Sequence, residues 1–194
     1  MDPKGVGALY VRRRAELTPI LFGGGHERGL RSGTLNVPGI VGFGTASALC
    51  RLEMTTDSER LRALRDRLNA GLHARLGGML VNGSMTERLP HSLNVSFEGV
   101  DGDSLLTGLS DLAVSSGAAC TSSAREPSHV LRAIGRTEAL ARASLRFGLC
   151  RVNTEEEVDY VVETVASLVS RLREGSAFDE FANGVADLPS NEYD

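Results

Sequence analysis

Leucines recur at spacings of three and four residues between residues 61 and 76, which is the spacing of one face of an α-helix. Upstream, Pro38 suits the first turn of a helix that would run to about residue 54. Between the two stretches lies Thr56-x-x-Glu59, a capping-box pattern that marks a helix start. The pattern predicts either two consecutive helices or one long bent helix, ended by the glycine pair 77–78.

A second apolar stripe, mainly of valine, has the same helical spacing between residues 158 and 172. Thr154-x-x-Glu157 precedes it as another capping box. Gly175 is a stop signal, so we expect the helix to end near it and a polar tail to follow. The leucine stripe carries no reactive side chain and is expected to face the core or an interface.

Shorter runs that alternate apolar and polar residues predict strands. Between them, Asp101 or Asp103, Ser128 after Pro127, and Glu138 mark the starts of short helices. Strands interleaved with helices place the chain in the α/β class. The expected strands are 7–12, 79–81, 92–97, 112–115 and 144–149, and the short helices are expected to end near residues 109, 134 and 143.

The composition is that of an ordinary globular protein of 194 residues, 41% hydrophobic and 24% charged. The net charge of −4 offers no basic surface for nucleic acid. No apolar run approaches the ~20 residues that span a bilayer. Three widely spaced cysteines, Cys50, Cys120 and Cys150, do not form a disulfide framework, which favours a reducing cytoplasm. The four histidines are too scattered to predict a metal site.

Cys120 lies in a run of small residues, from Val114 to Ser123, that follows a short apolar segment. Such residues bury little apolar area, and Gly117 gives the backbone freedom. The run is therefore typical of a loop that carries a reactive thiol. The alternative is a tight turn with an incidental buried cysteine, since free cysteine is among the most buried residue types.

A second loop, residues 22–34, contains five glycines and leaves no room for regular structure. Its backbone N–H groups, Arg28, Arg31 and the Thr34 hydroxyl suit an anion. A plain surface turn is the alternative, because a glycine-rich loop alone is a weak signal.

Four segments of the chain, Gly5–Val11, Gly23–Thr34, Ser115–Ser122 and Leu145–Phe147, together resemble one enzyme family in the expected order. They resemble the strand after the cofactor lysine, the long glycine loop, the mobile catalytic loop and the substrate-carboxylate strand of the cysteine desulfurases. These are pyridoxal-phosphate enzymes of the class V aminotransferase family with the aspartate-aminotransferase fold. The resemblance implies that residues 1–55 are a remnant of the large cofactor-binding domain with a dimer-interface loop. Residues 56–175 would form a small α/β sandwich domain with the catalytic cysteine loop, and residues 176–194 a C-terminal tail.

The resemblance implies a desulfurase that takes sulfur from L-cysteine, leaving alanine, for iron–sulfur cluster assembly. Cys120 would be the nucleophile that becomes a persulfide, and Arg146 would bind the substrate carboxylate as a bidentate pair. Taken alone, Arg146 also fits a strand arginine paired with a local acid. Thr34 would donate its hydroxyl to the cofactor phosphate of the neighbouring subunit, which implies a homodimer. The tail would meet the scaffold protein that receives the sulfur.

The departures from the family concern the cofactor. The family's Schiff-base lysine has no counterpart here, because Lys4 corresponds to a later lysine. The aromatic residue and the aspartate that hold the pyridine ring have no counterpart either. We therefore expect a chain truncated at its N-terminus and inactive unless the missing half is supplied. Cys150 replaces a glycine of the family, and we interpret it as a packed small residue.

Alternative functions remain at this point. The chain could be a non-enzymatic persulfide carrier or dimerising module that uses Cys120 as an acceptor. It could be an inert gene fragment that aggregates through an exposed apolar stripe. A selenocysteine lyase of the same fold is the enzymatic alternative, and the long run of small residues around Cys120 favours the desulfurase.

Overall fold

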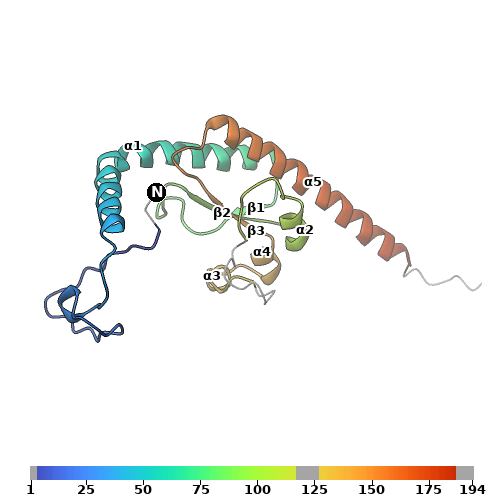
Figure 1. Cartoon of the computed structure of the whole chain (residues 1–194). Coiled ribbons are helices and arrows are strands. Elements are labelled where there is room, and N and C mark those ends of the chain that lie inside the picture. Colours follow the sequence, from blue (N-terminus) through green and yellow to red (C-terminus); the bar gives the residue numbers. More distant parts are fainter. Residues whose placement is uncertain (1–3, 117–126, 187–194) are drawn as a thin grey trace, which may run out of the picture. The chain divides into compact units, whose positions relative to one another are not determined.

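The computed structural model describes residues 4–116 and 127–186, with side chains described as far as residue 175 (Figure 1). Helices and a small antiparallel sheet make up these residues, so the predicted α/β class is confirmed. The elements in order are η1 (Glu27–Gly29), α1 (Val37–Arg75), β1 (Met79–Val81), β2 (Ser92–Phe97), α2 (Gly102–Thr107), α3 (His129–Ala133), α4 (Glu138–Arg142), β3 (Ser144–Gly148) and α5 (Glu155–Ala186).

The chain divides into two compact units, Met1–Thr56 and Asp57–Asp194. The boundary between them falls within α1. The assignment of residues 1–55 to a cofactor domain and of residues 56–175 to a catalytic domain stays a prediction.

The first unit consists of loops and the start of α1. Residues 7–12 form no strand, and Leu9 and Tyr10 are 78% and 88% exposed. The strand prediction is wrong here because a strand needs a hydrogen-bonded neighbour, and the paired strands of the described residues all belong to the second unit. The glycine loop is also less irregular than expected, since η1 forms one turn within it.

α1 is one helix of 39 residues, so the expectation of a separate helix starting at Thr56 is wrong and the one-helix alternative is correct. A capping box needs an N-cap residue outside the helix, but Thr56 has helical residues on both sides. No glycine or proline lies between residues 45 and 70 to interrupt the helix.

β2 is the central strand of the sheet and pairs antiparallel with β1 and with β3. Side chains of a strand alternate between the two faces of its sheet. One face is apolar and buried, with Leu93, Val95 and Leu145 at 0% exposure. The other face carries the polar residues of the same strands, and the candidate site lies there.

The apolar face packs against α5 and the part of α1 that belongs to the second unit. Both stripes seen in the sequence are buried in this core, and for the leucine stripe this is the first of the two expected positions, core or interface. Ion pairs of Arg67 with Asp159 and of Arg75 with Glu163 join the two helices there, and Figure 1 shows the start of α5 beside the end of α1. The stripe residues in the core are Leu64, Leu68, Leu72, Leu76, Val158, Val162, Val165 and Val169.

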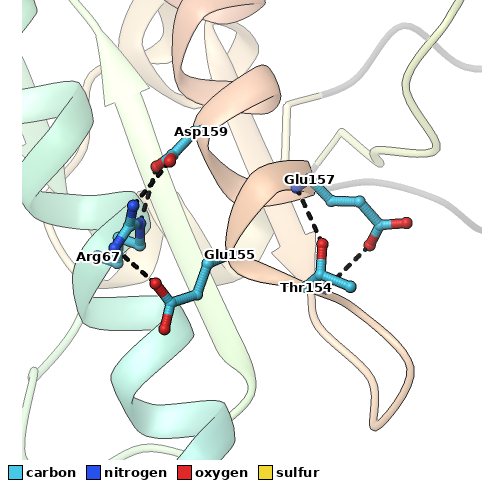
Figure 2. A network of polar contacts seen from close by, with 5 residues as sticks. All are labelled: Arg67, Thr154, Glu155, Glu157 and Asp159. Atoms are coloured by element: carbon cyan, nitrogen blue, oxygen red, sulfur yellow. Dashed lines mark hydrogen bonds and ion pairs between the residues drawn. The ribbon is translucent and has the colours of Figure 1, made fainter.

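The start of α5 is fixed by polar contacts that Figure 2 shows. Arg67 of α1 donates to both carboxylate oxygens of Asp159, at 2.8 and 2.7 Å, and to Glu155 Oε2 at 2.9 Å. The hydrogen bonds that Arg67 donates to Asp159 lower the pKa of the Asp159 carboxyl group. The Glu157 N–H donates to Thr154 Oγ1 at 3.3 Å and the Thr154 N–H donates to Glu157 Oε2 at 3.2 Å. The second capping box is therefore confirmed.

α5 continues past Gly175, the expected end, to Ala186. A single glycine costs a helix interior only about 1 kcal/mol, so it does not by itself stop a helix. Within the described residues, no helix has both the length and the apolar character needed to cross a bilayer.

Capping residues also place the three short helices. Asp101 is the N-cap of α2, and its carboxylate accepts from the Ser104 N–H at 2.8 Å. Ser128 and Thr137 cap α3 and α4 in the same way. α4 ends one residue before β3 begins. The strand that contains Arg146 therefore starts at a fixed position.

Candidate functional site

Four residues lie in one row across the polar face of the sheet, and we call them the polar row: Asn82, Asn94, Arg146 and Ser115. Asn94 of β2 is in register with Arg146 of β3. Arg146 forms an isolated antiparallel bridge with Ser115 on its other side. Asn82, directly after β1, donates its backbone N–H to Asn94 O at 2.9 Å and so extends the row.

Backbone hydrogen bonds show that the two middle residues of the polar row, Asn94 and Arg146, form a closely spaced pair. The Arg146 N–H donates to Ser115 O at 2.8 Å, and the Ser115 N–H donates to Arg146 O at 3.3 Å. The Asn94 carbonyl is bonded on the opposite side, to Asn82. Asn94 and Arg146 are therefore a non-hydrogen-bonded pair, whose Cα atoms lie about 4.5 Å apart with side chains close together on one face.

The Arg146 side chain is exposed. Among residues 4–116 and 127–175, no carboxylate forms an ion pair with it. The sequence left open a strand arginine paired with a local acid, and the described residues contain no such pair. An exposed guanidinium without a carboxylate partner offers its forked donors to an external carboxylate.

Ser115 connects the row to the cysteine segment. The strand expected over residues 112–115 is reduced to the single bridge at Ser115, because Ser115 is the one residue of the four that pairs with β3. Cys120 itself lies outside the described residues. Five peptide units separate Ser115 from Cys120, so covalent geometry limits the distance between their Cα atoms to about 18 Å.

Thr34 lies in the first unit, at the end of the glycine loop, and is exposed. The loop is closed by hydrogen bonds of its own, from the Gly25 N–H to Ser32 Oγ at 3.2 Å and from the Gly33 N–H to His26 Nδ1 at 3.3 Å. Those N–H groups are thus occupied, whereas the Thr34 hydroxyl bonds to none of the described residues. An exposed hydroxyl fits one contact to a phosphate oxygen.

The glycine loop also holds two non-glycine residues in the left-handed region, Glu27 at φ 51° and Arg28 at φ 60°. Such residues are uncommon in succession, and each stores roughly 1 kcal/mol or more of backbone strain. The internal hydrogen bonds of the loop hold this conformation. A loop that keeps strained residues in place presents Thr34 from a defined backbone.

Two residues of this chain, one in each unit, have side chains whose chemistry suits groups that a pyridoxal-phosphate enzyme must bind. Thr34 suits the phosphate and Arg146 suits a substrate carboxylate. Lys4 is the only lysine of the chain, and it is exposed. It corresponds in position to a lysine that follows the cofactor lysine, so no side chain of this sequence matches the covalent attachment point.

The other two cysteines are free and exposed. The interpretation of Cys150 as a packed small residue is wrong, because its turn lies at the surface, where its backbone N–H donates to Asn153 Oδ1 at 2.8 Å. Neither Cys50 nor Cys150 belongs to the polar row. Among the described residues, no three histidine, cysteine or acidic side chains gather as metal ligands would.

Sequence reasoning missed Asn82 and Asn94. Their signal was present in the alternation of Ser92, Asn94 and Ser96 with apolar residues, which places Asn94 on the face opposite the core. The pairing of Asn94 with Arg146 is a long-range contact that the alternation does not specify.

Comparison with known proteins places these features in a family. The class V aminotransferase family matches residues 1–161. The chain is 56% identical over 193 residues to a protein of Anaeromyxobacter sp. (strain Fw109-5) named cysteine desulfurase IscS. It is 55% identical over 186 residues to a protein of the same name from Actinobacillus succinogenes. These matches cover 98% and 94% of this chain but 48% and 46% of the relatives, so the chain spans about half of their length.

Solved structures agree with the sequence matches. A NifS-like protein is 38% identical and superposes with a TM-score of 0.76 over 88% of this chain and 44% of its own. A second structure, SspA in complex with cysteine, is 32% identical with a TM-score of 0.51 over 76% of this chain and 40% of its own.

Proposed function

This chain belongs to the class V aminotransferase family, and from that premise we propose that it is the sulfur-accepting part of a cysteine desulfurase. The observation that carries the proposal is the bridge between Ser115 and Arg146. It joins Arg146, which has no carboxylate partner among the residues that the structure describes, to the start of the segment that bears Cys120. The similarity to proteins named cysteine desulfurase supports the same reaction.

Cys120 is proposed as the nucleophile. Its thiolate forms a bond to the sulfur of L-cysteine, and the bond between that sulfur and the substrate Cβ breaks. The electron pair of the broken bond stays on the carbon skeleton, which takes up a proton and leaves as alanine. The enzyme keeps the sulfur as a persulfide on Cys120.

Arg146 is proposed to orient the substrate through its carboxylate. A bidentate arginine–carboxylate pair fixes both position and direction. The covalent limit of about 18 Å between Ser115 and Cys120 means that a substrate held at Arg146 stays within reach of a thiol on the neighbouring segment.

Thr34 is proposed to bind the cofactor phosphate of a neighbouring subunit, which makes the active form a homodimer. Pyridoxal phosphate, when bound, acts as the electron sink for the substrate. Since Lys4 is the only lysine, we propose that this chain does not release sulfur from L-cysteine by itself. Residues outside this sequence would supply the attachment point.

The proposal extends to partners and location. Residues 176–194 are proposed to meet an iron–sulfur scaffold or another protein that accepts the sulfur. The exposed thiols of Cys50 and Cys150 suit a reducing compartment, and we place the protein in the cytoplasm.

The test uses the purified chain, L-cysteine and pyridoxal phosphate, with and without a full-length cysteine desulfurase. Alanine is quantified, and each cysteine peptide is examined by mass spectrometry for one added sulfur atom. C120S is the test variant, and C50S and C150S are its matched controls because both thiols are exposed. We expect no alanine from the chain alone, and added sulfur on Cys120 when the full-length enzyme is present.

The outcomes test two parts of the proposal, the inactivity of the chain alone and the role of Cys120 as the sulfur acceptor. Alanine formed by the chain alone and lost in C120S would show a self-sufficient desulfurase and contradict the proposed inactivity. Sulfur on Cys120 without any alanine from the chain's own site would fit the persulfide carrier as well. Sulfur spread equally over Cys50, Cys120 and Cys150 would overturn the role of Cys120.

A further inference from the structure

We propose that Asn94 is a second donor for the substrate carboxylate, and that Arg136 is a positioning residue that orients the Asn94 amide through Asn82. The inference rests on the proposed role of Arg146 and adds to it. It follows from a chain of hydrogen bonds at one end of the polar row, in which each partner restricts the next.

The chain of hydrogen bonds starts at Arg136, in the turn after α3. Its Nε–H donates to Asn82 Oδ1 at 2.6 Å, and a second guanidinium N–H donates to Val81 O at 2.7 Å. Asn82 is 6% exposed, and its backbone carbonyl accepts from Arg88 at 2.8 Å. Asn82 is therefore held by Arg136 at its side chain and by Arg88 at its backbone carbonyl.

The direction of the amides follows from the chemistry of Arg136. A guanidinium only donates, so the side of the Asn82 amide that faces Arg136 must be the oxygen. The Asn82 NH₂ group then faces β2, where it donates to Asn94 Oδ1 at 2.6 Å and to Ser96 Oγ at 2.8 Å. Asn94 must accept there with its oxygen, which leaves its own NH₂ group turned away from Asn82.

The Asn94 NH₂ group lies on the face of the sheet that carries Arg146. Asn94 and Arg146 form the narrow pair of the polar row, with side chains on the same face. No other described side chain accepts from the Asn94 NH₂ group, and Asn94 is only half-buried. The row thus presents an amide donor directly beside a guanidinium that pairs with no carboxylate of the described part of the chain.

The arrangement suits a carboxylate. A carboxylate only accepts and has two oxygens with about four lone-pair sites, so it can take donors from Arg146 and Asn94 together. If the Asn94 amide were reversed, its oxygen would face the carboxylate and repel it. Arg136 therefore affects binding without touching the ligand, by excluding the reversed arrangement.

The experiment measures binding of L-alanine, the product of the proposed reaction, to the full chain by ¹H–¹⁵N NMR titration. L-alaninamide, which lacks the carboxylate, is the control ligand. We expect N94A to raise the dissociation constant about ten-fold, equivalent to about 1.4 kcal/mol. S92A is the matched control, because Ser92 is on the same strand and face, two residues away, and is in register with Gly148 rather than Arg146. It is expected to bind as wild type does.

Arg136 is tested by rescue. R136L is expected to weaken binding by a similar factor and to shift the Asn94 side-chain amide resonances before any ligand is added. R136K is expected to bind more nearly as wild type does, because lysine also can only donate. A merely structural role of Arg136 would make the binding loss follow the urea midpoint of each variant, so the midpoints are measured in parallel.

The results distinguish this inference from the proposed function. Equal dissociation constants for wild type and N94A, or no carboxylate-dependent shift at the Asn94 NH₂ group, would overturn the inference. A loss in N94A with unchanged binding in R146Q would instead overturn Arg146 as the anchor. Weakened binding in R136L without any change in the Asn94 resonances would overturn the role given to Arg136.

Discussion

Asp101 combines a structural role with a defined electrostatic one at the scale of a single residue. Its carboxylate accepts from the backbone N–H of Ser104 at 2.8 Å and from the Ser104 hydroxyl at 2.7 Å. Both bonds lower the pKa of Asp101 below its ordinary value of 3.8, and the bond from the backbone N–H has the larger effect. Because the folded protein binds this proton less tightly than the unfolded chain does, the bond stabilises the fold above pH 3.8 and the gain is lost as the pH falls through the folded pKa.

We predict that acidification removes the extra stability that Asp101 gives the folded protein compared with asparagine at the same position. D101N keeps an N-cap acceptor but cannot ionise. The difference in the free energy of unfolding between wild type and D101N should stay constant above about pH 5 and shrink toward pH 3. Urea unfolding of both proteins across this range measures it. A difference that widens on acidification would contradict the prediction.

The two capping-box patterns differ at the scale of the helix, although their sequences look alike. Thr154 lies before α5 and its hydroxyl accepts from the Glu157 N–H. Thr56 lies inside α1, where a β-branched residue only lowers helix propensity. The same motif therefore stabilises one helix start and has no capping role in the other place.

We predict opposite effects for the matched pair of alanine variants. T154A should lower the free energy of unfolding by about 1 kcal/mol, because a cap is lost. T56A should leave it unchanged or raise it by a few tenths of a kcal/mol, because alanine is the better helix former. Urea unfolding of both variants is the measurement. Equal destabilisation by T56A would show that a helix starts at Thr56 after all.

Patterns within short stretches of sequence predicted the helices and strands better than they predicted which of these elements pack or pair with each other. The apolar stripes of α1 and α5, the start of α2 at Asp101 or Asp103 and the strand of Arg146 follow from residues close together in the sequence. The polar row does not, because Ser115 and Arg146 are far apart in the chain and their bridge depends on strand pairing. The strand predicted for residues 7–12 was wrong for the same reason, because a strand-like pattern forms a strand only when a neighbouring strand pairs with it.

The cofactor question belongs to the whole molecule. Motifs predicted Cys120, Arg146 and Thr34 as site residues because each lies in a recognisable segment, and those roles stay predictions. The chain matches about half of the length of its relatives. Cofactor binding by the purified chain can therefore be measured in the absence of the other half of such a protein.

We predict that the purified chain, mixed with pyridoxal phosphate, shows no absorbance band of a lysine-bound cofactor. Lys4 is the only side-chain amine, it is exposed, and it lies in the first unit. Borohydride reduction followed by peptide mass spectrometry should find no specific cofactor adduct on Lys4. A band that K4A abolishes would contradict both this prediction and the proposed inactivity of the chain alone.

Arg146 has one more consequence, for the folding of the sheet. Leu145 and Phe147 flank it on β3 and are buried in the core. A slip of β3 by one residue against β2 would exchange the two faces of the strand. The guanidinium would then enter the apolar core unpaired, at a cost of several kcal/mol. The residue proposed to hold the substrate therefore also disfavours the shifted register of β3. Replacing it with an apolar residue would make the shifted register less unfavourable, in addition to weakening binding of the substrate.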